Sequence, residues 1–191
     1  MITGLFFGSF NPVHIGHLAI ANYILAYTDM EQLWFVVSPH NPLKKKQNLL
    51  TASDRLHLVN LAIDGHPAYR TCDIEFHMPQ PSYTIDTLVR LSEKYPQREF
   101  SIIMGSDNLE SFTKWKNHEA IIAQYHRYIY PRPDTPSHIF ENIENASVVD
   151  APLMEISSTF IRQTIRQGRD VPFFMPDKVY QYVKEMHFYE K

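Results

Sequence analysis

Short apolar runs alternate with segments of helical periodicity along this chain, and that alternation constrains the fold more than any other feature. Six apolar runs are predicted as strands: residues 2–7, 32–38, 69–74, 99–104, 126–130 and 147–149. Six helices are expected: residues 17–28, a helix capped by Thr51 or Ser53, and residues 84–95, 117–123, 157–167 and 176–186. Strands separated by helices predict an α/β fold, with a parallel sheet and helices on both of its faces.

The ends of the first and fourth predicted strands are where a ligand is expected. In parallel sheets of this kind, ligands bind beyond the carboxyl ends of the strands, at the point where the strand order reverses. Gly8 and Gly105 stand at these two ends, so we expect them to flank a site. The chain has 191 residues, which predicts one domain spanning residues 1–191.

Composition excludes several classes of protein. The net charge is -3, so no general basic surface for nucleic acid is expected, and any cation that binds phosphate must act locally. Cys72 is the single cysteine, which excludes an intrachain disulfide and a cysteine-based zinc site. Neither a membrane span nor a signal peptide is recognisable, so no membrane partner and a cytoplasmic location are expected. Histidines such as His57, His66, His118 and His187 show no spacing typical of metal ligands, so a metal site held by the protein is not expected.

Residues 8–17 read GSFNPVHIGH and join the first strand to the first helix. A glycine after the strand allows a sharp turn, and backbone N–H groups of the loop and helix start can face phosphate oxygens. His14 and His17 lie three residues apart at the helix start. Imidazole N–H groups can donate hydrogen bonds to phosphate, and a protonated ring adds positive charge. The segment therefore predicts binding of a nucleoside triphosphate.

Residues 156–162 read ISSTFIR and form a second candidate anion site. Three hydroxyl groups stand at the start of a helix, where free N–H groups favour anions. Arg162 follows one turn later and could place its guanidinium on the same phosphates. A simple helix cap by Ser157 or Ser158 also explains the hydroxyls.

Together these two segments resemble the nucleotidyltransferase superfamily that shares its histidine signature with class I aminoacyl-tRNA synthetases. Within it, the chain is similar to the bacterial nicotinate-nucleotide adenylyltransferases. Three further segments carry that narrower resemblance: PSYTIDTL at 81–88, MGSDNL at 104–109 with Phe112 and Trp115, and YPRP at 130–133. The resemblance implies a Rossmann-like, doubly wound sheet, ATP with Mg²⁺, and nicotinate mononucleotide as acceptor.

The resemblance also implies roles for individual residues. His14, His17 and Arg162 would be catalytic. The residues expected to bind ATP are Gly8, Ser9, Phe10, His14, His17, Gly105, Asp107, Ile156, Ser157, Ser158, Thr159 and Arg162. Those expected to bind the mononucleotide are Asn11, Lys44, Thr84, Trp115 and Arg132. Trp115 would stack on the pyridine ring and Thr84 would meet its carboxylate, although a helix cap explains Thr84 equally well.

Two departures from the family pattern affect these roles. Asn11 stands where such proteins often carry aspartate, so a role that needs a negative charge is in doubt there. The lysines at 44–46 match the family loop loosely; Lys44 is our choice for a phosphate contact, and a solvated lysine run is the alternative.

Two other functions are compatible with parts of the pattern. A sibling transferase acting on phosphopantetheine would not need the segment at 81–88 or Trp115, whereas one acting on nicotinamide mononucleotide is harder to separate. A nucleotide sensor without catalysis should have lost His14, His17 or Arg162, and all three are present. Oligomeric state is left open by the sequence, a homo-oligomer included.

Overall fold

A single parallel sheet forms the centre of the molecule. The computed structural model describes residues 1–39, 49–133, 135–136, 140 and 143–190. Its strands are β1 (Ile2–Gly8), β2 (Gln32–Val37), β3 (Tyr69–Cys72), β4 (Glu99–Gly105), β5 (Arg127–Tyr130) and β6 (Ala146–Val148). All six predicted strands are present, with small differences at their ends.

The strands lie in the order β3-β2-β1-β4-β5-β6, and every neighbouring pair is parallel. The order therefore reverses between β1 and β4, which lie side by side at the centre. Gly8 pairs with Val37 and Gly105 with Tyr130 at the carboxyl edge of the sheet. The ends of the first and fourth strands therefore meet at the reversal point, and that they flank a ligand site stays a prediction.

Helices connect and follow the strands. They are α1 (Ile15–Tyr27), α2 (Ala52–Ile63), α3 (Thr84–Lys94), α4 (Leu109–Phe112), α5 (His118–Gln124), α6 (Ser158–Arg166) and α7 (Asp177–Glu185). Short 3₁₀ turns are η1 (Ile74–His77), η2 (Ser106–Asn108) and η4 (Pro172–Phe174). Thr51 caps α2 by accepting a hydrogen bond from the Asp54 amide at 3.1 Å, so Thr51 rather than Ser53 is the capping residue.

The third strand ends earlier than predicted, because the chain turns out of the sheet into η1. Glu75 in this turn is buried, and its carboxylate accepts hydrogen bonds from Ser82 and Thr87, both at 2.9 Å. The pattern of residues 69–74 does not show where the strand ends, because it does not reveal that the carboxylate of Glu75 is buried and hydrogen-bonded.

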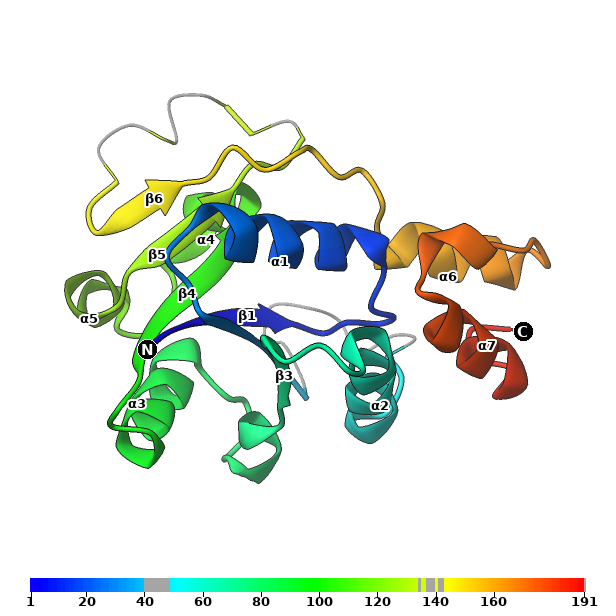
Figure 1. Cartoon of the computed structure of the whole chain (residues 1–191), viewed down its shortest axis with the longest axis horizontal. Coiled ribbons are helices and arrows are strands. Elements are labelled where there is room, and N and C mark those ends of the chain that lie inside the picture. The colour runs from blue at the N-terminus through cyan, green and yellow to red at the C-terminus, as the bar shows by residue number, and fades with distance from the viewer. Residues whose placement is uncertain (40–48, 134, 137–139, 141–142, 191) are drawn as a thin grey trace.

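Two apolar clusters cover the two faces of the sheet. Side chains of α1, α2, α6 and α7 pack in one cluster, with Phe6 of β1 and Phe35 of β2. Those of α3, α4 and α5 pack in the other, with Leu5 and Trp34 from the same strands. Consecutive strand residues such as Leu5 and Phe6 point to opposite faces of the sheet. Because helices pack on both faces, the sheet is doubly wound, as expected. Figure 1 shows α1 and α3 on opposite sides of β1.

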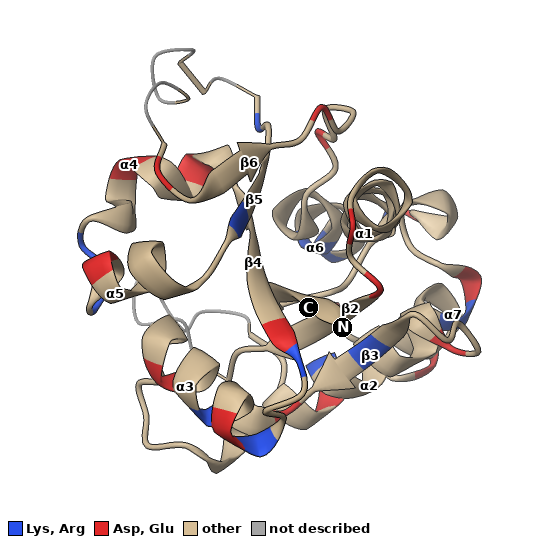
Figure 2. Ribbon diagram, turned by 60° about the vertical axis from the view of Figure 1, so that its left-hand side comes forward, with Lys and Arg blue, Asp and Glu red and all other residues tan. Residues whose placement is uncertain are grey.

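The carboxyl edge of the sheet is covered by elements from the end of the sequence. Figure 1 shows α6 and α7 beyond the end toward which β1 points. Acidic and basic residues are mixed along α3, whereas α6 carries only basic charges, Arg162 and Arg166 (Figure 2). A local positive charge at this edge is thus compatible with the net charge of -3.

Within the described residues, no helix is long and apolar enough to cross a membrane.

Candidate active site

The loop between β1 and α1 takes its shape from Phe10 rather than from the preceding glycine. Phe10 has a φ of 44° and is buried, and the Asn11–Pro12 peptide bond is cis. Gly8 remains in the strand; a Cβ there would lie 2.8 Å from Cζ of the Phe10 ring. Gly8 is therefore needed because the Phe10 ring occupies the space where a side chain would stand.

The two histidines stack at the start of α1. Their ring centroids are 3.7 Å apart at an interplanar angle of 31°. His14 is the N-cap of the helix, and its backbone N–H donates to Nδ1 of His17 at 3.2 Å. Because Nδ1 accepts this bond, the ring proton of His17 sits on Nε2. This tautomer places the N–H of His17 at Nε2, the donor that the predicted contact to phosphate requires.

His14 is an uncharged ring at neutral pH. It is 5% exposed, and burial lowers its pKa from 6.5 to about 3, with a smaller contribution from the positive charge of Arg132. The positive charge considered for the histidines is thus not supplied by His14. A contact from His14 to phosphate would therefore be one of a neutral ring.

This burial predicts a loss of stability in mild acid. The unfolded chain binds a proton at His14 below pH 6.5, whereas the folded chain stays neutral there until about pH 3. The free energy of unfolding should therefore fall with decreasing pH, approaching about 1.4 kcal/mol per pH unit from this group. Urea unfolding of the wild type and His14→Asn between pH 7.5 and 4.5 measures it. The variant should show the shallower dependence, and equal slopes would contradict the assignment.

The start of α6 docks directly on the β1–α1 loop. Ser158 Oγ donates to the Pro12 carbonyl at 2.8 Å, and Arg162 Nη1 donates to the Asn11 carbonyl at 2.7 Å. Ser157 Oγ accepts a hydrogen bond from the Phe160 amide at 3.2 Å, so Ser157 is the residue that caps the helix. The two predicted phosphate segments, more than a hundred residues apart in the sequence, therefore form one surface.

Two further contacts involve α6 and the residue two positions before it. Thr159 Oγ1 accepts a hydrogen bond from Arg162 Nη2 at 3.2 Å, and burial lowers the pKa of Arg162 below its usual value. The Ile156 carbonyl passes 3.6 Å from where a Cβ on Gly16 would lie. That distance is an ordinary contact, whereas the same Cβ would lie only 3.1 Å from Cε1 and Nδ1 of His14, so Gly16 leaves room for the His14 ring.

The end of β4 faces the same loop. A Cβ on Gly105 would collide with the Asp107 carboxylate and lie 3.2 Å from Cγ and Nε of Arg132. Arg132 Nε is 3.7 Å from Asp107 Oδ1, and the guanidinium lies over the Tyr130 ring at 5.4 Å. The positive charge of Arg132 also contributes to lowering the pKa of His14, so Arg132 after β5 lies within electrostatic range of the histidine pair.

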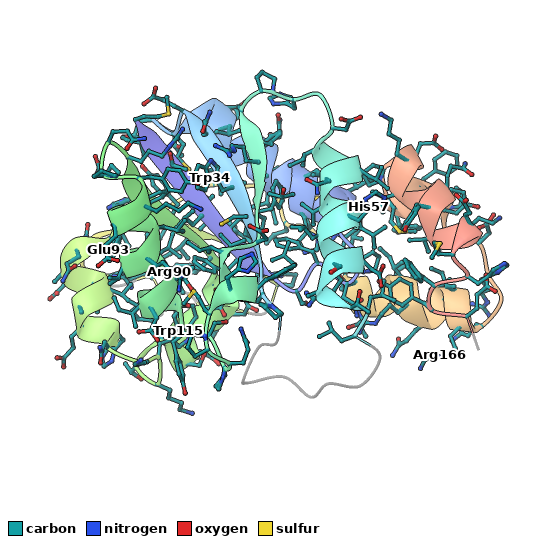
Figure 3. The ribbon with its side chains drawn as sticks, turned by 90° about the horizontal axis from the view of Figure 1, so that it is seen from below. Trp34, His57, Arg90, Glu93, Trp115 and Arg166 are labelled. Carbon is teal, nitrogen blue, oxygen red and sulfur yellow. The ribbon has the colours of Figure 1, made fainter. Side chains whose placement is uncertain are left out.

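The segments proposed for the acceptor also come together. Thr84 is the first residue of α3, confirming its place at a helix start. Lys116 Nζ lies 2.8 Å from Asp86 in the first turn of that helix and 4.9 Å above the Tyr83 ring. Trp115 is partly buried and packs 5.2 Å from the Phe112 ring. Figure 3 shows Trp115 beneath the green helices, across the view from Arg166 of α6.

Three site residues carry buried nitrogen atoms without a hydrogen-bond partner among the residues that the structure describes. They are His14 Nδ1, Trp115 Nε1 and Arg132 Nε. Buried polar atoms are satisfied in the great majority of cases, and an unpaired one costs about 1–3 kcal/mol. A fourth atom of this kind, Arg127 Nε, belongs to β5 and to no predicted site residue. The three nitrogen atoms of the predicted site residues are therefore candidates for contacts to a polar ligand.

Comparison with known proteins agrees with this geometry. Residues 5–164 match the cytidylyltransferase-like family. A relative from Flavobacterium psychrophilum, named probable nicotinate-nucleotide adenylyltransferase, is 50% identical over 100% of both chains. One of the same name from Bacteroides fragilis is 48% identical, covering 94% of this chain and 89% of its own. This chain belongs to the nicotinate-nucleotide adenylyltransferase family.

The fold of this family member matches solved structures as well. A Plasmodium falciparum nicotinic acid mononucleotide adenylyltransferase complexed with NaAD superposes with a TM-score of 0.84. The two chains are 18% identical, and the match covers 98% of this chain and 97% of the other. At that identity the likeness supports the fold alone.

Arg55 is a residue of this adenylyltransferase-family site that pattern reasoning missed. It is fully buried, and its guanidinium donates to the carbonyls of Ser9 at 2.6 Å, Ser38 at 2.8 Å, Pro39 at 2.9 Å and Leu50 at 3.1 Å. It thereby ties the loop after β1 to the chain after β2. A single arginine in an amphipathic helix normally faces water, so the sequence carried no signal for it.

Two predicted acceptor residues have a different standing in the structure. Lys44 lies outside the described residues. Asn11 is buried, and its Oδ1 accepts hydrogen bonds from the Leu50 amide at 3.2 Å and the Tyr189 hydroxyl at 2.8 Å. The role of both residues in mononucleotide binding stays a prediction.

Proposed function

We propose that this chain joins nicotinate mononucleotide to the AMP moiety of ATP, giving nicotinate adenine dinucleotide and pyrophosphate in NAD biosynthesis. The observation that carries the proposal is the docking of the α6 start on the β1–α1 loop beside the histidine pair. Backbone N–H groups, imidazole donors and a guanidinium converge there at the sheet's reversal point, the arrangement that a triphosphate needs. Similarity to relatives of that name over the full length supports the choice of reaction.

The reaction is a direct displacement at phosphorus. An oxygen of the mononucleotide phosphate attacks the α-phosphorus of ATP, the bond to the β-phosphate oxygen breaks, and its electron pair leaves with pyrophosphate. A phosphate monoester has a second pKa near ~6, so the nucleophile is already ionised at neutral pH. No general base and no covalent enzyme intermediate are required. The chain contributes positioning and charge stabilisation.

The residues divide between the two substrates. His17 Nε2–H is proposed to steady the α-phosphate as negative charge grows, with neutral His14 beside it. Arg162 and the α6 start would hold the leaving pyrophosphate. Gly105 and Asp107 would meet the ribose of ATP. Thr84, Trp115 and Arg132 would orient the mononucleotide, and its carboxylate would lie near the positive end of α3.

Mg²⁺ is proposed to accompany ATP. Among the described residues, no group of three or more histidine, cysteine or acidic side chains could hold a metal ion. Mg²⁺ that accompanies a nucleotide is usually held mainly by phosphate oxygens and water, so it needs few ligands from the chain. When bound, the ion would neutralise charge on the triphosphate. The residues of the chain would then bind the phosphates themselves, through Arg162 and the loop amides.

Substrate choice is tested by supplying ATP and Mg²⁺ with each of three acceptors separately and following pyrophosphate release. Nicotinate mononucleotide should give the highest kcat/KM, followed by nicotinamide mononucleotide. Release with phosphopantetheine alone would overturn the assignment.

Trp115→Ala should raise the KM for nicotinate mononucleotide about tenfold or more and change the KM for ATP little, because one stacked ring contributes about 1–3 kcal/mol.

A further inference from the structure

The segment after α7 returns to the phosphate loop. The helix ends in a Schellman motif, in which the Phe188 amide donates to the Val183 carbonyl at 3.0 Å and the His187 amide to that of Lys184 at 3.1 Å. His187 takes the left-handed position of this motif, with a φ of 52°, although glycine is the usual residue there. The reversal carries Tyr189 back into the apolar cluster that also includes Phe6 of β1 and Ile20 of α1.

Tyr189 ends against Asn11 of the β1–α1 loop. Its side chain is 8% exposed, and its hydroxyl donates to Asn11 Oδ1 at 2.8 Å. The same oxygen accepts from the Leu50 amide, while the Asn11 carbonyl accepts from Arg162 Nη1 at 2.7 Å. One asparagine thus links the segment after α7, the chain just before α2 and the α6 arginine.

The chemistry of the pair favours a fixed contact. Burial raises the pKa of the Tyr189 phenol well above its ordinary value, outweighing the opposite effect of Arg162 and Arg55 nearby. The hydroxyl therefore stays protonated and acts as a donor. The Asn11 side-chain oxygen accepts this bond as a neutral group.

We propose that Tyr189 is a positioning residue for the reaction, because its hydroxyl holds Asn11 and thereby fixes the loop amides and the Arg162 guanidinium against the triphosphate. The inference rests on the proposed function. Tyr189 touches no reacting atom and acts through Asn11. Placing phosphate donors within a few tenths of an ångström matters because stabilisation of developing charge depends on donors that are already oriented.

The test compares two tyrosines that differ in what they hold. Tyr180 is also 8% exposed, belongs to the same cluster, and donates to Asp170 Oδ1 at 2.6 Å, away from the loop. Tyr189→Phe should lower kcat about tenfold, the value of one well-placed hydrogen bond, and change the KM for ATP less. Tyr180→Phe should keep kcat within about twofold, although both variants lose similar thermal stability. Equal kcat values for the two variants would overturn the proposal.

A second comparison separates positioning from general support. If Tyr189 acts through Asn11, adding Tyr189→Phe to Asn11→Ala should cause no further loss of kcat, whereas additive losses would contradict the proposal. Amide hydrogen exchange at residues 9–11 should be faster in Tyr189→Phe than in Tyr180→Phe, and equal rates would also contradict it. Hydrogen exchange needs no substrate, so it tests the positioning role of Tyr189 independently of the reaction. The proposed function is refuted separately, if the wild-type protein does not use nicotinate mononucleotide.

Discussion

Replacing His17 by alanine is expected to lower kcat about 100-fold or more while the protein remains folded. The Nε2–H of His17 is the donor proposed for the α-phosphate, where charge grows in the transition state, and loss of one such donor costs about that factor. The ring packs against Phe10 at a centroid distance of 5.1 Å, so a modest fall in thermal midpoint is also expected. Pyrophosphate release at saturating ATP and nicotinate mononucleotide measures kcat.

His57 provides the matched control for this variant. It is an exposed histidine on α2 whose ring packs 4.6 Å from that of Tyr182 (Figure 3). His57→Ala removes the same side chain away from the phosphate loop and should leave kcat unchanged. Near-normal turnover of His17→Ala would sink the catalytic assignment, whatever its effect on stability.

Replacing Arg55 by alanine is expected to lower the free energy of unfolding by about 3–5 kcal/mol. Four backbone carbonyls lose a buried donor, and each unsatisfied buried group costs about 1–3 kcal/mol unless water enters the space left behind. Three of these carbonyls belong to the chain after β1 and β2, so turnover should also fall. Urea unfolding monitored by fluorescence gives the change.

The control is Arg90→Ala on α3. Arg90 is exposed and carries the same charge, so its replacement should change the free energy of unfolding by less than about 0.5 kcal/mol. If the two variants were equally stable, the buried guanidinium would not hold the loops as described.

The architecture was readable from the sequence because strands and helices repeat local patterns. The run at residues 32–38 and the helix from Thr84 carry their periodicity within about ten residues, and both are present as β2 and α3. The meeting of Gly8 and Gly105 followed from general rules of parallel sheets. The early end of β3 was missed because Glu75 finds its partners Ser82 and Thr87 in a later segment.

The residues proposed for phosphate chemistry were likewise predicted from local segments, since spacing alone places His14 and His17 on one helix start. The sequence by itself therefore determined the α/β class, the family and the pairing of the two phosphate segments as a hypothesis. The tertiary structure decided that His14 is neutral, that Phe10 rather than Gly8 makes the turn, and that Arg55 and Tyr189 hold the loop from behind. Each of these depends on burial and on contacts between distant segments, which no local pattern of residues encodes.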